Sequence, residues 1–296
     1  MEKLKAFMKR KNIVISARRY GIDALGAMAQ GLFCSLLIGT ILNTIGTQFH
    51  VGFLTAQIVT INGVGYTIGG MASFMSGAAM AVAIGYALQA PPLVLFSLAT
   101  VGYACNALGQ AGGPLAVLFV AIIAAEAGKA VSKETKIDIL VTPVVTTLVG
   151  IGAAWVIAPP IGFVASAFGQ VIMQATELQP FLMGVVVSVL VGVALTLPIS
   201  SAAICSVLGL TGLAGGAAVV GFAVMSFKEN GWGGLVSQGL GTSMLQMPNI
   251  VKNPRVWIAP TVASAITGPI ATCIFRLQMN GDAINSGMGT CGLCGQ

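Results

Sequence analysis

The sequence predicts an all-helical protein that crosses a membrane about eight to ten times. Its composition, the placement of its few charges and its long apolar stretches support this fold class. Of the 296 residues, 56% are hydrophobic and only 7% are charged, whereas soluble domains carry about 25% charged residues because their surface faces water. The 39 glycines also fit transmembrane helices, in which small residues let backbones approach closely. This composition excludes an ordinary soluble globular protein.

The N-terminal segment 1–20 is strongly basic. It carries seven of the 14 lysines and arginines within its first nineteen positions. Leu4, Phe7 and Met8 recur among these charges at helical spacing, which predicts a short amphipathic helix on the anionic cytoplasmic leaflet. The positive-inside rule then places the N-terminus in the cytoplasm of a bacterial cell, with the chain in the inner membrane as a multi-pass protein. The positive net charge therefore reflects membrane orientation and does not indicate nucleic-acid binding.

The predicted spans follow from the length of the apolar stretches, because a membrane helix needs about 20 mostly apolar residues. The apolar stretch after the basic segment is too long for a cleavable signal peptide. The predicted spans are residues 22–46, 67–89, 91–109, 113–128, 137–158, 180–197, 199–227 and 254–276.

Three glycine-containing stretches between these spans carry scattered polar residues: 47–66, 161–178 and 231–250. Non-helical backbone survives at membrane depth only where protein or a water-filled cavity satisfies its polar groups. These stretches are therefore candidates for re-entrant hairpins that line a substrate path. The alternative is that they are ordinary loops and tilted helices. The basic loops 129–136 and 252–255 are expected on the cytoplasmic side.

The sequence contains a weak internal similarity between two of its segments. Two sets of residues match at a constant shift of 153 positions, 184 minus 31, and this indicates structural repeats near 22–160 and 175–280 within one transmembrane domain, 21–296. Chance recurrence of small residues in glycine-rich helices is the alternative. The first set is Gly31, Ser35, Leu37, Gly39 and Leu42, and the second is Gly184, Ser188, Leu190, Gly192 and Leu195.

Motifs for catalysis, metals or cofactors are absent from the sequence. It has one histidine, His50, no phosphate-binding loop and no pair of carboxylates spaced for acid–base chemistry. Four cysteines stand singly in apolar runs, where a thiol behaves as a small hydrophobe. Cys291 and Cys294 form a CxxC, but a structural zinc site needs four ligands. We therefore expect no cofactor, no metal and no enzyme acting alone.

Side-chain amides and hydroxyls inside apolar segments are the candidate substrate-binding groups. Asn106 and Gln110 lie in the stretch 103–114, and Gln238, Thr242 and Ser243 lie in 233–249. Both stretches contain glycines and a proline, which interrupt helical hydrogen bonding. We predict that the two stretches converge near the middle of the membrane and bind a neutral polar solute. The alternative is that these groups only bridge helices.

Two further residues complete the candidate set. Asn62 is included because the polar stretch 47–66 is a candidate for lining the path. Glu126 is the best candidate among the few carboxylates, since carboxylates in membrane segments are costly and often functional. An ion pair with Lys129, three residues later, is its alternative role.

Three blocks resemble a known family. They are residues 230–260 (NGWGGLVSQGLGTSMLQMPNIVKNPRVWIAP), 197–204 (LPISSAAI) and 286–296 (SGMGTCGLCGQ). Together they resemble the IIC membrane components of the phosphotransferase system, in the branch described as toxin regulators of the perfringolysin-regulator type. The resemblance covers nearly the whole chain and implies a transport domain for a sugar or similar solute, normally a homodimer.

Two departures from the family pattern affect the expected function. Family members continue beyond the Gly-Met-Gly-Thr motif, so a final hairpin or helix is expected to be missing after Gln296. No cytoplasmic phosphoryl-carrying domain is fused to the chain, so phosphorylating transport would need separate IIA and IIB proteins. The alternatives to a transporter are a membrane-embedded regulator or sensor and a structural or assembly protein.

Overall fold

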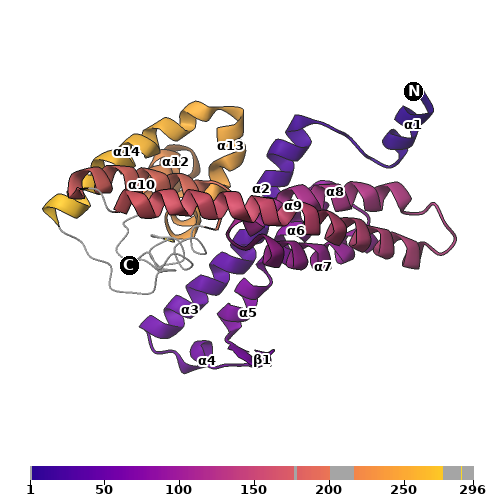
Figure 1. Cartoon of the computed structure of the whole chain (residues 1–296), viewed down its shortest axis with the longest axis horizontal. Coiled ribbons are helices and arrows are strands. Elements are labelled where there is room, and N and C mark those ends of the chain that lie inside the picture. Colours follow the sequence, from indigo (N-terminus) through magenta and orange to yellow (C-terminus); the bar gives the residue numbers. More distant parts are fainter. Residues whose placement is uncertain (1, 177–178, 201–216, 276–287, 289–296) are drawn as a thin grey trace. The chain divides into compact units, whose positions relative to one another are not determined.

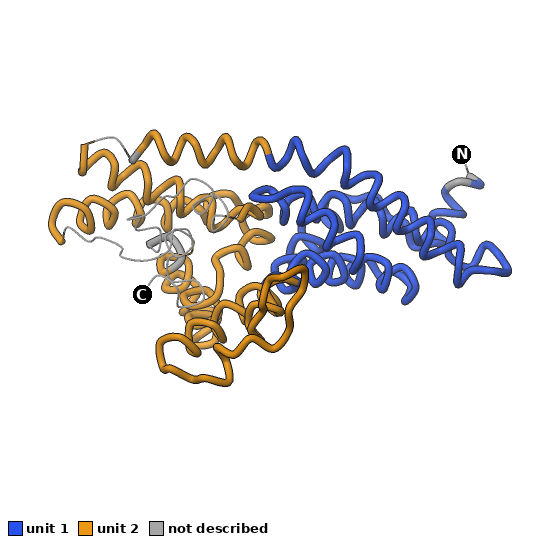
Figure 2. The backbone as a smooth tube through the Cα atoms, turned by 60° about the horizontal axis from the view of Figure 1, so that its bottom comes forward, with its two compact units in different colours: residues 1–32, 75–162 blue, residues 33–74, 163–296 orange. Residues whose placement is uncertain are grey.

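The computed structural model describes residues 2–176, 179–200, 217–275 and 288, and it confirms the all-helical, polytopic membrane fold (Figure 1). Within these residues the only sheet is a two-stranded hairpin. The chain divides into two compact units, which Figure 2 shows in different colours. Unit 1 comprises Met1–Leu32 and Met75–Gly162, and unit 2 comprises Phe33–Phe74 and Phe163–Gln296.

Unit 1 is a bundle in which α6 packs against α2, α7 and α8. Small residues make these contacts close. For example, a Cβ atom at Gly77 would lie 2.5 Å from the carbonyl oxygen of Gly102, so α6 and α7 meet backbone to backbone. The elements of unit 1 are α1 (Glu2–Arg10), η1 (Arg19–Asp23), α2 (Ala24–Leu32), α6 (Ser76–Ala87), α7 (Pro92–Gly109), η3 (Gln110–Gly112), α8 (Gly113–Val131) and the first part of α9 (Asp138–Thr176).

Unit 2 contains the remaining elements, and its core is formed by α10 together with residues of α9 and η2, including Leu37, Ile172 and Val191. α14 packs against α10 and α12. The elements are η2 (Phe33–Leu37), α3 (Ile38–Gln48), α4 (Gly52–Thr55), β1 (Val59–Ile61), β2 (Val64–Tyr66), α5 (Ile68–Phe74), α10 (Pro180–Thr196), α12 (Ala217–Val236), η4 (Ser237–Gly241), η5 (Ser243–Gln246), α13 (Met247–Lys252), η6 (Pro254–Trp257), α14 (Ile258–Pro269) and η7 (Ile270–Ile274).

Three differences from the sequence prediction concern connecting segments. The stretch 47–66 contains the antiparallel hairpin of β1 and β2, whose two turn residues Asn62 and Gly63 both have positive φ, as a tight hairpin turn requires. Residues 161–176 are helical and continue α9 without a break. Lys129, predicted in a loop, is instead buried in the last turn of α8.

The count of membrane spans depends on how bent helices are treated. Among the described residues, four helical stretches are long and apolar enough to cross a membrane, and α5 with α6, bent by 53°, makes a fifth. One of the four, Pro92–Val131, turns at η3 into two helices that pack against each other. α10 is a further, shorter apolar helix. The predicted count of eight to ten stays a prediction, and much of the expected span 199–227 lies outside the described residues.

The contact between α10 and α14 shows how tightly the helices of unit 2 approach. A Cβ atom at Gly268 would lie 2.0 Å from the carbonyl oxygen of Gly184, a distance that real atoms do not adopt. The same approach lets the Ser188 hydroxyl donate to the carbonyl oxygen of Ser264 across the interface, at 2.8 Å. Small residues therefore set the separation of these two helices.

We predict that Gly268→Ala lowers the stability of the folded protein by about 1–3 kcal/mol, because the added methyl group forces α10 and α14 apart. Gly152→Ala is the matched control, since it is also helical but has no atom within 4 Å of the position of a Cβ. Thermal unfolding in detergent, followed by size-exclusion chromatography, measures both. Equal midpoints for the two variants would contradict the close contact.

Candidate functional site

Residues 231–257 of unit 2 are a helical segment whose backbone breaks repeatedly. Gly231 has φ 56° and ψ −149°, which kinks α12. A π-helical turn, η4, follows, and then Thr242 adopts an extended conformation with φ −146° and ψ 140°. Such backbone leaves groups without intrahelical partners, so in a membrane protein it must be enclosed by protein or face a cavity. Consistent with this, Gln238, Thr242 and Ser243 are buried.

The hydroxyl groups of Thr242 and Ser243 in the break are paired within the protein. Thr242 Oγ1 accepts a hydrogen bond from the backbone N–H of Met244 at 3.2 Å and so caps η5. Ser243 Oγ donates to the carbonyl oxygen of Leu195 at 3.2 Å and lies 3.3 Å from Thr196 Oγ1. Both contacts on Ser243 come from the end of α10, so this side chain ties the break to α10.

Gln238 differs from its neighbours because its side-chain oxygen has no hydrogen-bond partner among the described residues. The residue is 5% exposed, and its Oε1 makes no hydrogen bond within the part of the chain that the structure describes. A buried polar atom without a partner costs about 1–3 kcal/mol. Most buried polar atoms in proteins are paired, so an unpaired one needs a functional or structural explanation.

The other two amides of the predicted site, Asn106 and Gln110, lie in unit 1. Asn106 packs where α6, α7 and α8 meet, because a Cβ atom at Gly113 would lie 2.4 Å from its Oδ1 and one at Gly77 would lie 2.5 Å from its Cβ. Gln110 is exposed at the turn between α7 and α8 and has φ 46°, an uncommon conformation outside glycine. The predicted convergence with 233–249 stays a prediction, because the two stretches belong to different units.

The remaining two candidates have local explanations. Asn62 is exposed at the turn of the β1–β2 hairpin, where asparagine tolerates the positive φ. Glu126 forms an ion pair with Lys129 at 2.8 Å, which is the alternative role that the sequence left open. The carboxylate of Glu126 does not accept a well-aligned hydrogen bond among the described residues.

Lys129 is the largest fully buried side chain among the described residues. Besides Glu126, its Nζ donates to the carbonyl oxygens of Asn12 at 3.0 Å and of Leu88 at 3.2 Å. A buried ammonium group needs such compensation, because burial removes its hydration. Lys129 therefore joins three segments of unit 1.

Sequence reasoning missed two polar residues next to the break, Thr196 and Gln246. Both are buried, and Gln246 Oε1 accepts a hydrogen bond from Asn249 Nδ2 at 2.9 Å. Gln246 lies within the 230–260 block, and Thr196 immediately precedes the block 197–204. Their position in or next to these two blocks is the sequence signal that could have identified them. No cluster of three or more His, Cys, Asp or Glu side chains suited to a metal occurs in the described ranges, and Cys291 and Cys294 lie outside them.

Comparison with protein families identifies the chain. The model of the family described as "Phosphotransferase system, EIIC" matches residues 22–296. The chain therefore belongs to the phosphotransferase system EIIC family, whose members are the membrane-embedded transport components of that system. No curated protein and no solved structure matches it.

The different pairing of Ser243 and Gln238 predicts opposite effects on stability. Ser243→Ala removes the hydrogen bond to Leu195 and lowers stability by about 0.5–1.5 kcal/mol. Gln238→Met keeps the side-chain length but removes the unpaired oxygen, so the folded protein keeps or gains stability. Thermal unfolding in detergent compares the two variants. A loss with Gln238→Met as large as with Ser243→Ala would mean that the Gln238 oxygen has a partner in the protein.

Proposed function

We propose that this EIIC-family chain carries a sugar or a similar neutral polar solute across the membrane, and that Gln238 contacts the solute directly. The observation that carries the proposal is the buried Oε1 of Gln238, which has no partner in the described ranges and lies within a break of the helical backbone. A solute hydroxyl that donates to this oxygen supplies the missing hydrogen bond. The free energy that is lost in the empty protein is then recovered on binding.

The chemistry around Gln238 favours a neutral ligand. Residues 230–251 include no lysine, arginine, aspartate or glutamate, so the polar groups of the break are amides, hydroxyls and backbone atoms. These groups hydrogen-bond sugar hydroxyls without requiring a charge on the ligand. An anionic solute would need a cation near it, because burial of an unpaired charge is costly.

The candidate residues have different roles in this proposal. Thr242 and Ser243 shape the break through the bonds to Met244 and Leu195, and they present their remaining hydrogen-bonding capacity to the solute. Gln110 offers an exposed amide on unit 1 and is proposed as a second solute contact. Asn106, Asn62 and Glu126 stay predicted contacts, and the proposal does not depend on them, since each has the local role described above.

Membership of the EIIC family implies that the chain works with cytoplasmic IIA and IIB proteins. In the proposed mechanism these separate proteins carry the phosphoryl group, and the present chain performs the membrane step. We further propose that two copies form a homodimer in the inner membrane of a bacterium, with the N-terminus in the cytoplasm. The seven basic residues among the first nineteen support this orientation.

The second candidate function is a membrane-embedded regulator or sensor without transport of its own. It is supported by the resemblance of the 230–260 block to the toxin-regulator branch. In that case solute binding at Gln238 would serve as a signal, and no net uptake would accompany it.

The proposed function predicts that the purified protein binds at least one member of a panel of radiolabelled hexoses, disaccharides and hexitols. Gln238→Met is expected to weaken this binding about tenfold while the protein remains folded, because one hydrogen bond to the solute is lost. Gln110→Ala tests the second contact, and uptake into proteoliposomes with the IIA and IIB partners tests transport. If both variants bind and transport the solute as well as the wild type does, these amides are structural groups and not solute contacts. If the wild-type protein binds a solute but does not transport it, the regulator is the better assignment.

The proposed orientation predicts the side from which single cysteines react. In a variant without native cysteines, Lys136→Cys and Lys252→Cys should react with an impermeant maleimide only after the cell is opened, since both positions lie in basic segments expected inside. Gly63→Cys, in the turn of the β1–β2 hairpin, is a third labelled variant, and its reaction in intact and in opened cells is compared with that of the other two. Reaction of Lys136→Cys or Lys252→Cys in intact cells would refute the orientation.

A further inference from the structure

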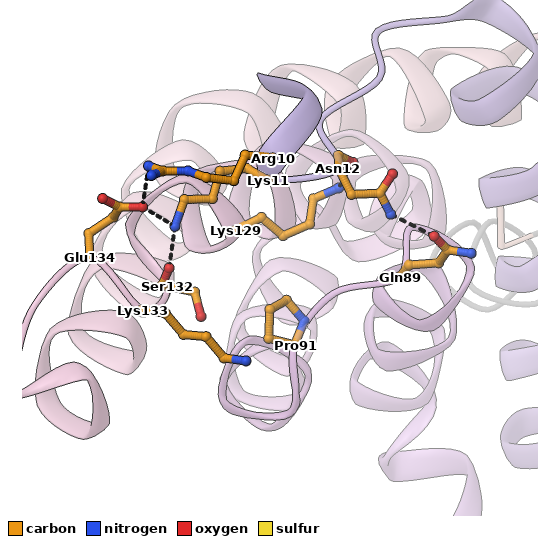
Figure 3. Close-up of a pocket in the computed structure, with 9 residues that line it drawn as sticks. All are labelled: Arg10, Lys11, Asn12, Gln89, Pro91, Lys129, Ser132, Lys133 and Glu134. Atoms are coloured by element: carbon orange, nitrogen blue, oxygen red, sulfur yellow. Dashed lines mark hydrogen bonds and ion pairs between the residues drawn. The ribbon is translucent and has the colours of Figure 1, made fainter. Parts of the chain in front are cut away.

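A pocket of about 400 Å³ lies at one end of unit 1, where the N-terminal segment meets the ends of two helices (Figure 3). Its size is within the range of ligand-binding pockets in proteins, about 300–1,000 Å³. The N-terminal segment, the turn after α6 and the segment from the end of α8 into the following loop form its walls. The lining residues are Arg10, Lys11, Asn12, Gln89, Pro91, Lys129, Ser132, Lys133 and Glu134.

The pocket carries more positive than negative charge. Arg10 Nη2 lies 2.7 Å from Glu134 Oε1, and Lys11 Nζ forms an ion pair with the same oxygen. The hydrogen bond from Lys11, together with the nearby Arg10, holds the pKa of the Glu134 carboxyl below its ordinary value, so the group is ionised at neutral pH. A single carboxylate thus serves two cations.

Lys133 is the pocket cation without a direct ion pair among the described residues, although its charge acts on Asp138 at longer range. Its ammonium group forms no hydrogen bond or ion pair with any described residue, and Figure 3 shows its side chain extending towards Pro91. Lys129 is already matched by Glu126. Beyond the Glu126–Lys129 pair, the lining therefore has three cations, Arg10, Lys11 and Lys133, against the one carboxylate of Glu134. Asp138 lies outside the lining but interacts with Lys11 and Lys133, so the positive excess is smaller than the lining alone gives.

The loops around the pocket are held in uncommon conformations. Asn12, Gln89 and Lys133 all have left-handed φ angles, of 53°, 55° and 61°, and they are half of the described non-glycine residues with positive φ. Asn12 Nδ2 donates to Gln89 Oε1 at 2.6 Å, which joins two of the loops. The backbone N–H of Lys133 donates to Asp138 Oδ1 at 2.7 Å, which fixes the third. Backbone strain of this kind clusters at ligand clamps.

Apolar side chains lie next to this basic pocket in the chain. Ile137, Ile139 and Leu140 are each more than half exposed, and they follow Glu134 at the start of α9, an apolar helix long enough to cross a membrane. A pocket of cations beside exposed apolar side chains at the end of a membrane helix suits a phospholipid, whose phosphate meets the cations and whose acyl chains meet the helix. A soluble phosphate would use only the cations.

We propose that this pocket binds a phosphate group, and that the phosphate belongs to an anionic phospholipid of the surrounding leaflet. Arg10 and Lys133 contact the phosphate, while Lys11 holds the N-terminal segment in place through Glu134 and the carbonyl oxygen of Ser132. Lipid binding then adds to the contacts that already hold the N-terminal segment 2–12 at the end of α8. The positive charge of the N-terminal segment serves this site in addition to setting orientation.

Native mass spectrometry of the full-length protein tests the proposal with phosphatidylglycerol as the probe. Phosphatidylcholine is the comparison, because its phosphate is balanced by a quaternary ammonium group and its headgroup has no net charge. Phosphatidylglycerol is expected to bind more tightly, and Lys133→Gln should weaken it about fivefold, the effect of one cation at a membrane surface. Arg10→Gln should have a similar effect and leaves Lys11 paired with Glu134. Lys136→Gln is the matched control, because it is an exposed lysine of the same loop that does not line the pocket.

The alternative outcomes are distinct. Equal phosphatidylglycerol binding by the wild type, Lys133→Gln and Arg10→Gln would overturn the proposal. An equal loss in Lys136→Gln would also overturn it, since general surface charge would then explain the binding. A second arm measures thermal stabilisation by inorganic phosphate and glycerol 3-phosphate. If these stabilise the wild type but not Lys133→Gln, while the phospholipid shows no preference, a phosphate site exists but its assignment to lipid is wrong.

Discussion

Satisfaction of backbone hydrogen bonds without water is the constraint on which the rest of this structure depends. In hydrocarbon an unpaired N–H or C=O group costs several kcal/mol, so the chain is helical wherever it can be. α9 illustrates the strength of the constraint, since it continues through Pro143, Pro159 and Pro160 for 39 residues. At about 1.5 Å per residue such a helix exceeds the thickness of a hydrocarbon core of about 30 Å. Exposed strand backbone is confined, among the described residues, to the short β1–β2 hairpin.

The same constraint explains why the broken segment of unit 2 is buried. Between Gly231 and Met247 the backbone passes through a kink, a π-helical turn, an extended residue and a 3₁₀ turn. Side chains then supply the hydrogen bonds that regular helix would have provided, as Thr242 does for the N–H of Met244. Glycine allows the close packing that this needs, because a Cβ atom at Gly241 would lie 2.6 Å from the ring of Phe33. A polar break of this kind is costly to build, and a Gln238 oxygen without a partner in the described part of the chain adds to the cost.

Polar and charged groups of unit 1 are arranged on a different principle. There, cations neutralise backbone carbonyl groups at the ends of helices, where the helix dipole is negative. Leu88, which follows α6, accepts hydrogen bonds from both Arg19 and Lys129, and Ser132 at the end of α8 accepts one from Lys11. Lys129 and Lys11 are thus paired with carbonyl and carboxylate groups, whereas the ammonium group of Lys133 has no hydrogen bond or ion pair among the described residues. Among the described residues, unit 2 thus has a buried neutral acceptor without a hydrogen bond, and the pocket of unit 1 has a cation without a direct ion pair. This difference is why we assign them ligands of different chemistry.

The amino-acid sequence by itself determined the membrane class, the helical fold and the positions of most helices, because hydropathy is local and adds up along a stretch. The predicted spans 91–109, 113–128 and 180–197 agree closely with α7, α8 and α10. It also pointed to the 230–260 block, since several glycines, prolines and amides close together weaken a helix more than any one of them alone. Only the tertiary structure showed that Gln238 and Ser243 differ in hydrogen bonding, whereas the sequence predicted the same role for both. The partner of Ser243 is Leu195, 48 positions away, and no local pattern encodes such a contact. For the same reason the burial of Lys129 was not foreseen, because its carbonyl partners at Asn12 and Leu88 come from distant parts of the chain.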